Sequence, residues 1–331
     1  MKVITRRDAL TMLAAARVAS AQQAGVEAPG RIPPFAELVN ADEFRAVAER
    51  KLDPITFAEV GGSERSAFEK ITFRPRLMID SRQMDLSSQL FGDTLFTPIL
   101  IGPIARQKRY HPEGELAMVR GAAAGKASVV VSADSSYPIE QIAEASKTPL
   151  WYQVYLDSEV PGKVPQAMKA GCKALCITAA TAFDWKAIDR LRQGVSAPVI
   201  LKGVMSPGEA QKAVAAGLQG IVISNYSPKP ITGIASPIEM LPSIADAVGG
   251  KIAILIDGSF RRGSDVLKAI ALGANAVLLG RPVIWGLASY GAEGVQAVIE
   301  LIQTEFARDM AMCGKVSLKA VDRTVVRIHT R

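Results

Sequence analysis

No stretch of 18 or more consecutive apolar residues occurs in this sequence, which excludes a membrane-spanning helix. Aromatic residues make up only 6% of the 331 residues, a fraction that favours α/β packing over a β-sandwich. The three cysteines, Cys172, Cys176 and Cys313, are odd in number and form no C-x-x-C pair. This spacing disfavours a disulfide framework and a metal site, so we predict buried free thiols and no bound metal.

Acidic residues are outnumbered, with 32 Asp and Glu against 39 Lys and Arg, for a formal net charge of +7. Much of the excess lies at the two ends, in RRDALTMLAAAR and KAVDRTVVRIHTR, and no basic stripe interleaved with aromatic side chains lies between them. A nucleic-acid partner is therefore not expected. Hydrophobic residues at 49% predict a globular chain with a sizeable core, either one large α/β barrel or two domains.

Residues 1–21 have the features of an export signal. The stretch TRRDAL resembles a twin-arginine motif, a short apolar run follows, and Ala19-Ser20-Ala21 offers a cleavage site for a signal peptidase. We therefore expect export to a bacterial periplasm, with residues 22–34 as a linker. The alternative is an amphipathic helix in a cytoplasmic protein, because Arg17 interrupts the apolar run.

From residue 97 to 318 one pattern repeats eight times: a short run of branched apolar residues, then a segment with helical spacing, then Gly or Pro. Near-continuous apolar strands that alternate with helices indicate a parallel sheet covered by those helices. Eight such units predict a (β/α)8 TIM barrel. An open doubly wound sheet is the alternative, and the absence of a GxGxxG motif after the first strand argues against it. The eight runs are TPILIGPIA, ASVVVSAD, LWYQVYL, KALCITAA, APVILKGV, GIVISNY, IAILIDGS and AVLLGRPV.

The segments outside the repeats are expected to complete the barrel. Residues 35–96 predict a short N-terminal helical cap that closes one end of the barrel, with a helix over 35–52 and an irregular stretch over 53–96. A last helix over about 291–313 completes the outer ring, and residues 319–331 form a basic C-terminal tail.

Two turns at the expected phosphate-binding end of the barrel carry glycines and arginines. After the seventh strand the chain reads Asp257-Gly258-Ser259-Phe260-Arg261-Arg262-Gly263, and after the eighth it reads Gly280-Arg281-Pro282. Glycines allow close approach of backbone N–H groups, and the helix after Arg262 is expected to direct its positive end to the same place. Forked arginine donors suit a phosphate. The alternative is ordinary turn chemistry with solvated arginines.

Polar residues end the other strands and are expected to face the same opening. Lys202 ends an otherwise apolar strand and must meet an anionic or electron-rich partner. Uncharged amide and hydroxyl groups suit the edge of a heterocycle, and together with a phosphate site they fit flavin mononucleotide (FMN). The residues of this set are Ser132, Gln153, Tyr155, Thr178, Lys202, Ser224 and Asn225.

On these motifs the sequence resembles the FMN-dependent 2-hydroxy-acid oxidase and dehydrogenase family, over nearly all of residues 35–318. The stretches that carry the likeness are PILIGPIARQKRYHPEGELA, LWYQVY, VILKGV, GIVISN, LIDGSFRRGSDVLKAIALGA and LLGRPVIWGLA. The resemblance implies an oxidoreductase that binds FMN, acts on a small molecule with a carboxylate, and assembles as a homotetramer. It implies flavin contacts from Pro103, Ile104, Ala105, Ser132, Gln153, Thr178 and Lys202, and ribityl or phosphate contacts from Asp257, Gly258, Ser259, Arg261, Gly280 and Arg281.

The sequence departs from this family where the family does its chemistry. Tyr226 stands where the family has its base histidine, and Lys229 where it has the arginine that binds the substrate carboxylate. Ala180 replaces the aspartate that orients the histidine, and the following substrate loop is largely missing. We expect Phe57 at the position of the family's active-site tyrosine, and Tyr155 is retained. The candidate catalytic residues are therefore Tyr226, Lys229 and Tyr155.

These departures weaken the case for proton abstraction. A general base needs a pKa near the working pH, which an imidazole has and a phenol, near ~10, does not. The two histidines of the chain do not fill this role: His111 precedes the first barrel helix, and His329 lies in the basic tail, where we expect it to be solvated. Three readings stay open: an FMN oxidoreductase with an altered substrate, a flavoprotein that binds or carries electrons, and an enzyme that uses FMN for chemistry other than hydride transfer.

Overall fold

A computed structural model describes residues 31–62, 64–76, 84–156, 160–178, 183–226, 233 and 235–329. The expected signal over 1–21 and most of the linker lie outside these residues, as do Ala180 and Lys229. The chain divides into two compact units, up to Glu37 and from Leu38 onward. In the first, a 3-10 turn η1 spans Phe35–Glu37, and Arg31 pairs with Glu37 at 2.7 Å. All further statements concern the second unit.

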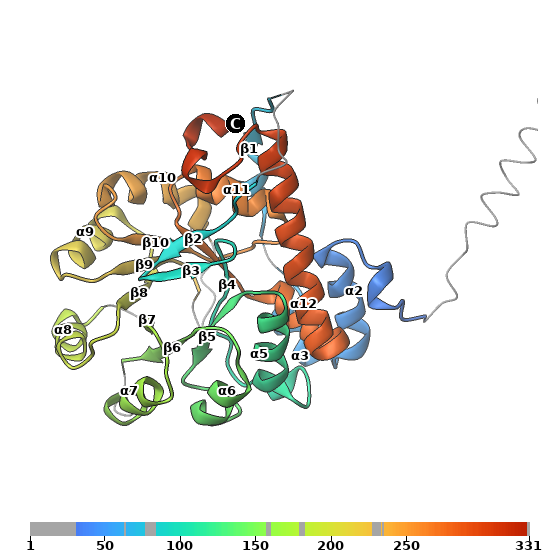
Figure 1. The fold of residues 1–331 in the computed structure, drawn as a ribbon, viewed down its shortest axis with the longest axis horizontal. Helices are drawn as coiled ribbons and strands as arrows, with labels where there is room; N and C mark the ends of the chain where they lie inside the picture. Colours follow the sequence, from blue (N-terminus) through green and yellow to red (C-terminus); the bar gives the residue numbers. More distant parts are fainter. Residues whose placement is uncertain are drawn as a thin grey trace, which may run out of the picture. The chain divides into compact units, whose positions relative to one another are not determined.

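Eight parallel strands of the described chain close into a barrel in the order β10-β11-β4-β5-β6-β7-β8-β9 (Figure 1). All eight apolar runs identified in the sequence form these strands, so the predicted (β/α)8 fold is confirmed. The last strand pairs with the first, with Val277 beside Ile99 and Leu279 beside Ile101. The strands are β4 (Ile99–Ile101), β5 (Ser128–Ser132), β6 (Leu150–Tyr155), β7 (Leu175–Thr178), β8 (Val199–Val204), β9 (Gly220–Ile223), β10 (Ala253–Ile256) and β11 (Ala276–Leu279).

A ring of helices surrounds the barrel (Figure 1). The ring consists of α5 (Gly114–Ala124), α6 (Ile139–Ala145), α7 (Val160–Lys169), α8 (Trp185–Gln193), α9 (Pro207–Ala215), α10 (Pro237–Val248), α11 (Gly263–Ala271) and α12 (Arg281–Met312). The last helix starts ten residues earlier than predicted, and non-helical backbone at Tyr290 and Gly291 bends it. At the bend the backbones of Gly286 and Gly294 approach so closely that a Cβ on Gly286 would lie 2.4 Å from the Gly294 carbonyl oxygen.

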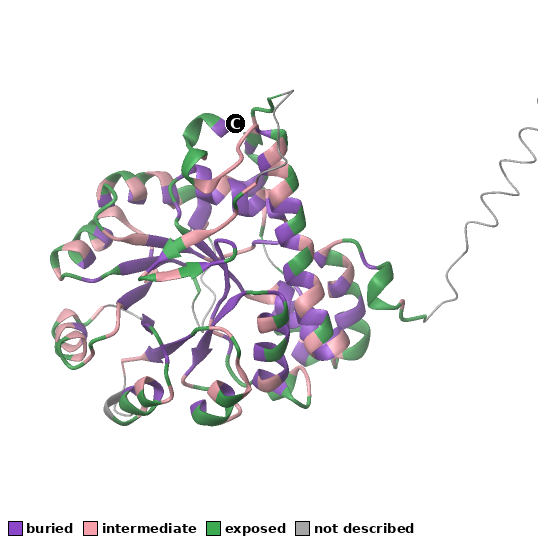
Figure 2. Cartoon of the chain, viewed as in Figure 1, coloured by how far each residue is buried: buried purple, intermediate pink, exposed green. Residues whose placement is uncertain are grey.

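Most residues of the barrel strands are buried (Figure 2). Buried hydrophobic side chains form one cluster inside the barrel and a larger one between strands and helices. The interior is closed by a hairpin of β2 (Ser88–Leu90) and β3 (Asp93–Leu95), which lies over the barrel centre in Figure 1. Its Leu90 and Leu95 join the interior cluster, and the Phe91 ring lies 5.4 Å from the Trp151 ring. The predicted buried free thiols are present at all three cysteines.

The segment before the barrel is more regular than predicted. The helix expected over 35–52 is α2 (Ala41–Lys51), because the Asn40 side chain accepts hydrogen bonds from the N–H groups of Asp42 and Glu43 and starts the helix there. The stretch expected to be irregular, 53–96, contains α3 (Pro54–Val60), α4 (Ser66–Glu69), β1 (Ile71–Phe73) and the hairpin. Asp53 caps α3 in the same way, with Pro54 at the first helical position.

The basic C-terminal segment is packed against the protein. Short 3-10 turns at Leu318–Ala320 and Arg323–Val325 lead into β12 (Val326–Ile328), which pairs antiparallel with β1. Val325 and Val326 are buried. His329, expected to be solvated, is half-buried, and its Nε2 lies 2.8 Å from the Thr72 hydroxyl. Among the described helices, none is long and apolar enough to cross a membrane, and the same residues contain no group of His, Cys, Asp and Glu arranged to hold a metal.

Candidate active site at the carboxyl end of the barrel

The predicted polar residues meet in one layer at the carboxyl ends of neighbouring strands. In the ladder, Ser132 pairs with Gln153, and Thr178 lies between Tyr155 and Lys202. Because parallel strands end at the same edge, residues far apart in sequence are placed side by side. Ser132, Gln153, Thr178 and Lys202 are all buried, and Tyr155 is half-buried at the outer edge of the layer. Ser224 and Asp257 directly follow the ends of β9 and β10.

Lys202 is the charged centre of this layer. Its ammonium group lies 2.5 Å from a carboxylate oxygen of Asp257 and donates to the Ser224 hydroxyl at 2.7 Å. Asp257 therefore supplies the anionic partner that the sequence required for a lysine at this position. Asp257 was assigned to the ribityl and phosphate side from the resemblance, and in this structure its carboxylate faces Lys202.

Two polar atoms of the layer have no hydrogen-bond partner in the described part of the chain. The Ser132 hydroxyl donates to Gln153 Oε1 at 3.0 Å, yet Gln153 Nε2 on the same side chain is buried and unpartnered. The Thr178 hydroxyl is buried and unpartnered as well. A buried polar group without a partner costs about 1–3 kcal/mol. A donor and a hydroxyl left open beside a lysine fit a ligand with polar ring edges.

Tyr226 lies over Lys202 at the opening. Its backbone N–H donates to the Ser224 hydroxyl at 3.2 Å, and its ring centre lies 5.4 Å from the Lys202 ammonium. The side chain is 58% exposed, as expected for a residue that lines an opening. Burial raises the pKa of Tyr155 to about 12, and the neighbouring Tyr226 side chain and a hydrogen bond to it act in the same direction. Of the three candidate catalytic residues, Tyr226 and Tyr155 are thus adjacent, and Lys229 lies outside the described residues.

Two side chains of α3, Phe57 and Glu59, make different contacts. The Phe57 ring packs against Gly61 and lies 5.4 Å from the Arg45 guanidinium. Glu59 instead pairs with Arg109. Burial and then Glu59 raise the pKa of the adjacent Tyr110, and Tyr226 contributes in the same direction. That Phe57 takes the position of the family's tyrosine stays a prediction.

Sequence reasoning missed several charged groups around the opening. Arg109 and Tyr110 follow β4 within GPIARQKRY, and Arg106 from the same stretch pairs with Asp134 at 3.0 Å. Their position after a barrel strand was the available signal. Of the three predicted flavin-face residues in this loop, Ile104 is buried, Pro103 is half-buried and Ala105 is exposed. The Gln107 side-chain amide, which donates to the Ile104 carbonyl at 3.2 Å, fixes the loop.

The two glycine-arginine turns lie side by side after β10 and β11. Gly258 has φ +102° and Ser259 has φ +62°, a backbone that side-chain-bearing residues rarely adopt. The Arg261 guanidinium is buried, lies 4.4 Å from the Trp285 ring centre and donates to the Phe260 carbonyl at 2.9 Å. Arg281 donates to the Gly62 carbonyl oxygen. The space that a Cβ on Gly280 would occupy is open for at least 4 Å.

Electrostatics favour an anion between these turns. Burial lowers the pKa of Arg261, and repulsion from Arg281 and Arg65 adds to this effect. Burial likewise lowers the pKa of Arg281. Guanidinium groups keep their proton at neutral pH, and the nearby carboxylates of Asp42, Asp265 and Asp257 offset only part of the effect on these two cations, so the turns favour an added anion. A phosphate monoester supplies the charge and the oxygen geometry that two arginines require.

One predicted part of the phosphate site is wrong. The first N–H group of α11 is already bound by the carboxylate of Glu305, and the two N–H groups that precede the helix are bound by Asp265. The N–H of Gly263 donates to Glu305 at 2.8 Å, and those of Arg261 and Arg262 donate to Asp265 at 2.8 and 3.0 Å. The helix that begins next to the open space is α12, with Gly280 as its N-cap and no side-chain cap there. A helix terminus without a side-chain cap leaves N–H donors for an anion.

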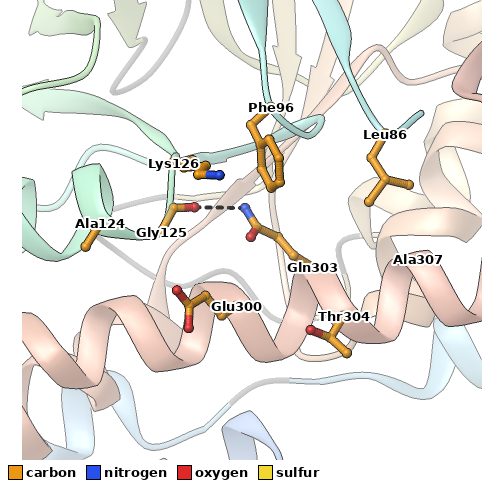
Figure 3. A pocket seen from close by; sticks show the side chains of 9 residues that line it. All are labelled: Leu86, Phe96, Ala124, Gly125, Lys126, Glu300, Gln303, Thr304 and Ala307. Carbon is orange, nitrogen blue, oxygen red and sulfur yellow. Dashed lines mark hydrogen bonds between the residues drawn. The ribbon is translucent and has the colours of Figure 1, made fainter. Parts of the chain in front are cut away.

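A separate pocket lies away from this layer. It has a volume of about 370 Å³ and is lined by residues of α5, α12 and the chain before β4, among them Phe96, Lys126 and Gln303 (Figure 3). The Gln303 side-chain amide donates to the Gly125 carbonyl at 3.0 Å, the bond drawn in Figure 3. Lys126 and Phe96 precede the starts of β5 and β4, so this pocket is at the amino end of the barrel and contains none of the predicted site residues.

Comparison with known proteins gives consistent matches. The family described as FMN-dependent dehydrogenase matches residues 55–182 and 178–328. A peroxisomal (S)-2-hydroxyacid oxidase of Arabidopsis thaliana is 34% identical, with 88% of this chain and 97% of the relative covered. An L-lactate oxidase of Nostoc sp. is 32% identical, with 88% and 98% covered. A crystal structure of mandelate oxidase with (S)-2-phenylpropionate matches with a TM-score of 0.83 at 31% identity, covering 89% of this chain and 100% of that one.

Proposed function

This chain belongs to the FMN-dependent dehydrogenase family, and from that premise we propose that it oxidises a substrate other than the simple 2-hydroxy acids. Its family makes it an FMN-dependent oxidoreductase related to the 2-hydroxyacid oxidases and dehydrogenases. The observation that supports FMN at the carboxyl end of the barrel is the pair of unpartnered buried atoms, Gln153 Nε2 and Thr178 Oγ1, next to Lys202.

The residues present fit this cofactor. Ser132, Gln153 and Thr178 would hold polar edges of the flavin ring system, with Lys202 beside them. The backbone of Pro103, Ile104 and Ala105 would lie along one ring face. When bound, FMN supplies two-electron redox chemistry at the centre of the barrel opening. The ribityl chain and phosphate would be held by Asp257, Gly258, Ser259, Arg261, Gly280 and Arg281.

The substrate side supports a changed specificity. Tyr226 occupies the place after β9 where the resembled family has its base, and Tyr155 has a pKa of about 12. A phenol with such a pKa holds its proton at neutral pH, so Tyr155 donates a hydrogen bond and does not abstract a proton. Tyr226 and Tyr155 would therefore orient a substrate by hydrogen bonding. Lys229 would add a point charge in place of the planar fork of an arginine.

The alignments with the family and with a relative also indicate that this chain differs on the substrate side, in the segment directly after β7. The family match is split into two parts, and the parts meet at residues 178–182, directly after β7. The alignment with the Arabidopsis oxidase spans 351 positions, which exceeds the 331 residues of this chain. The relative therefore has segments that this chain lacks. This supports the loss of the substrate loop expected between Thr181 and Trp185.

Anaerobic reduction of the bound flavin tests the proposal. The purified protein should show a flavin absorption spectrum, which dithionite bleaches and which lactate, glycolate and mandelate leave unchanged over minutes. A panel of other alcohols, aldehydes and amines then searches for the substrate. Reduction by one of the three hydroxy acids at rates of ~1–10³ s⁻¹, typical of enzymes, would refute the altered specificity.

A flavoprotein without substrate oxidation is the second candidate. It is favoured by the absence, among the described residues at the opening, of a histidine that could act as base. His111 is not there: it lies against Gly291 at the bend of α12. Under this reading no organic reductant in the panel bleaches the flavin, while dithionite and a protein electron donor do. A flavin that one organic substrate reduces excludes it.

We also propose that the protein is exported to a periplasm and that it assembles as a homotetramer. The twin-arginine motif at Arg6 and Arg7 supports export to a periplasm after the cofactor is bound, since that route carries folded proteins. The family resemblance supports a homotetramer. Sedimentation or light scattering on the purified protein measures the number of subunits directly.

A further inference from the structure

A segment before the barrel is attached to both glycine-arginine turns. Arg281 donates to the Gly62 carbonyl oxygen, and the Lys268 ammonium of α11 donates to the Phe68 carbonyl at 2.9 Å. The Phe68 ring meets the Phe260 ring edge-on, with 5.1 Å between the centres. Gly62 and Phe68 are therefore both held by residues of the two turns or of the helix that follows one of them.

Asp265 connects the middle of this segment to the first turn. Asp265 is 1% exposed, and its two oxygens both accept hydrogen bonds from one nitrogen, Nη2, of Arg65 at 3.0 and 2.9 Å. One of these oxygens also accepts the backbone N–H of Arg261 at 2.8 Å and that of Arg262 at 3.0 Å. A single buried carboxylate thus binds the segment on one side and the backbone of Arg261 on the other.

The contacts that place Arg261 include one to its backbone and one to its side chain. Its backbone is held by Asp265, and its guanidinium lies on the face of Trp285. Trp285 is itself fixed, because its ring N–H donates to the Val60 carbonyl at 3.0 Å. The aromatic face sets the plane of the guanidinium, and the bond to Asp265 sets the position of its backbone. Removing the hydrogen bond to Asp265 would let the backbone of the turn move.

We propose that Asp265, held by Arg65, is a positioning residue for Arg261, and that it links binding of the FMN phosphate to the packing of residues 64–69. This inference rests on the proposed function, in which Arg261 binds that phosphate. Asp265 itself touches no cofactor. The effect runs in both directions, because a phosphate that fixes Arg261 also strengthens the contact between Asp265 and Arg65.

The negative charge of Asp265 allows a charge effect to be separated from a positioning effect. A negative charge behind two phosphate-binding arginines weakens their attraction for an anion. If charge alone mattered, Asp265→Asn would leave a more positive site and bind the phosphate more tightly. If positioning matters, the same substitution weakens phosphate binding, because asparagine offers one accepting oxygen instead of two and turns its amide NH₂ towards either the Arg65 guanidinium or the two backbone N–H groups. The two accounts predict opposite signs.

The experiment compares FMN with riboflavin, which lacks the phosphate. The full-length protein is stripped of flavin, and quenching of flavin fluorescence gives both dissociation constants. Asp265→Asn should reduce the preference for FMN over riboflavin at least tenfold while the riboflavin constant stays within twofold. Glu305→Gln is the matched control, since Glu305 is 7% exposed and binds the N–H of Gly263 without touching Arg261. It should leave the preference unchanged.

Three results would overturn the proposal. They are that Asp265→Asn binds FMN more tightly, that it leaves the preference for FMN over riboflavin unchanged, or that it weakens the binding of both flavins equally. Equal weakening would mean a general structural role. Arg65→Lys keeps the charge, but its side chain is one atom shorter and does not reach the position of Arg65 Nη2. It serves where Asp265→Asn fails to fold: it should reduce the preference for FMN several-fold, and no reduction contradicts the link. Arg261→Ala separates the two ideas, because an unchanged preference there refutes the phosphate assignment itself.

Discussion

The ammonium group of Lys202 lies 5.4 Å below the centre of the Tyr226 ring and 2.5 Å from the carboxylate of Asp257. The lysine at the centre of the barrel opening is therefore neutralised from one side and covered by an aromatic ring from another. In the resembled family a histidine follows the same strand. By that resemblance we propose that Tyr226 replaces a titratable base with a ring that stacks over a cation and offers a hydroxyl at its rim.

We expect Thr178→Val to separate ligand binding from folding. The Thr178 hydroxyl is buried without a partner in the described chain, so valine of similar shape removes an unmet hydrogen-bonding group. The flavin-free protein should be unchanged or more stable by up to about 1 kcal/mol. Flavin affinity should fall about tenfold. Urea unfolding and flavin fluorescence titration measure the two quantities, and a large loss of stability without flavin would contradict the assignment.

Lys202→Met should destabilise the folded chain even without flavin. Methionine fills the space of the lysine stem but leaves the Asp257 carboxylate without its cation in a mostly buried place. Breaking such a pair lowers the free energy of unfolding by about 3 kcal/mol, and removing the negative charge of Asp257 as well recovers part of this loss. The double variant with Asp257→Asn should therefore be more stable than Lys202→Met alone. Urea midpoints followed by circular dichroism give the comparison, and a double variant less stable than the single one would refute this account.

The barrel and the inner part of its site follow from local sequence. Strands buried on both faces are continuous apolar runs, which can be located in the sequence. Since the strands are parallel and neighbouring, locating them also places the residues at their ends side by side, among them Ser132, Gln153, Thr178 and Lys202. The segment before the barrel does not follow in this way. Three-residue strands such as β2 and β3 carry no period of their own, and contacts with the barrel interior stabilise them.

The carboxylates behind the phosphate turns were also beyond sequence reasoning. Glu305 lies 42 residues after the Gly263 N–H that it binds, and Arg65 lies 200 residues before Asp265. Only the folded chain shows that the positive end of α11 is capped from within. Glu59 is a similar case, because its partner Arg109 lies 50 residues later in the chain.

Alkaline pH should destabilise the chain partly through Tyr155. Its pKa is about 12 in the folded chain, raised first by burial, against ~10 for an exposed tyrosine. A raised pKa means that the folded state keeps its proton longer, so the contribution to stability is complete below pH ~10 and is lost as the pH rises towards 12. Tyr155→Phe should therefore lose less stability than the natural chain between pH 9 and 11.5. Equal losses in urea unfolding at these pH values would contradict the shift.

Replacing Arg6 and Arg7 with lysines should retain the protein inside the cell. The twin-arginine pair precedes a short apolar run and the Ala19-Ser20-Ala21 site. Fractionation of cells that carry either version measures the distribution, and the N-terminal sequence of the exported form should begin at residue 22. Substituting Lys2 and Arg17 is the control, because both are basic and lie outside the pair. A periplasmic fraction that the Arg6 and Arg7 substitutions do not change would refute the signal.

The strongest functional prediction concerns Tyr226. Proton transfer by a positioned base contributes roughly 10²–10⁴-fold, so a phenol in place of the imidazole makes turnover of 2-hydroxy acids negligible. Tyr226→His combined with Ala180→Asp restores the base and the carboxylate that the resembled family uses to orient it. This double variant should reduce its flavin with lactate or mandelate at least 10²-fold faster than the natural chain, with a pH profile that rises near the pKa of a histidine, ~6.5. Tyr226→Phe is the control that removes the hydroxyl without adding a base, and it should gain nothing. If Tyr226→Phe abolishes a hydroxy-acid oxidation that the natural chain performs at ordinary enzymatic rates, the phenol is itself catalytic and the argument from the missing histidine is wrong.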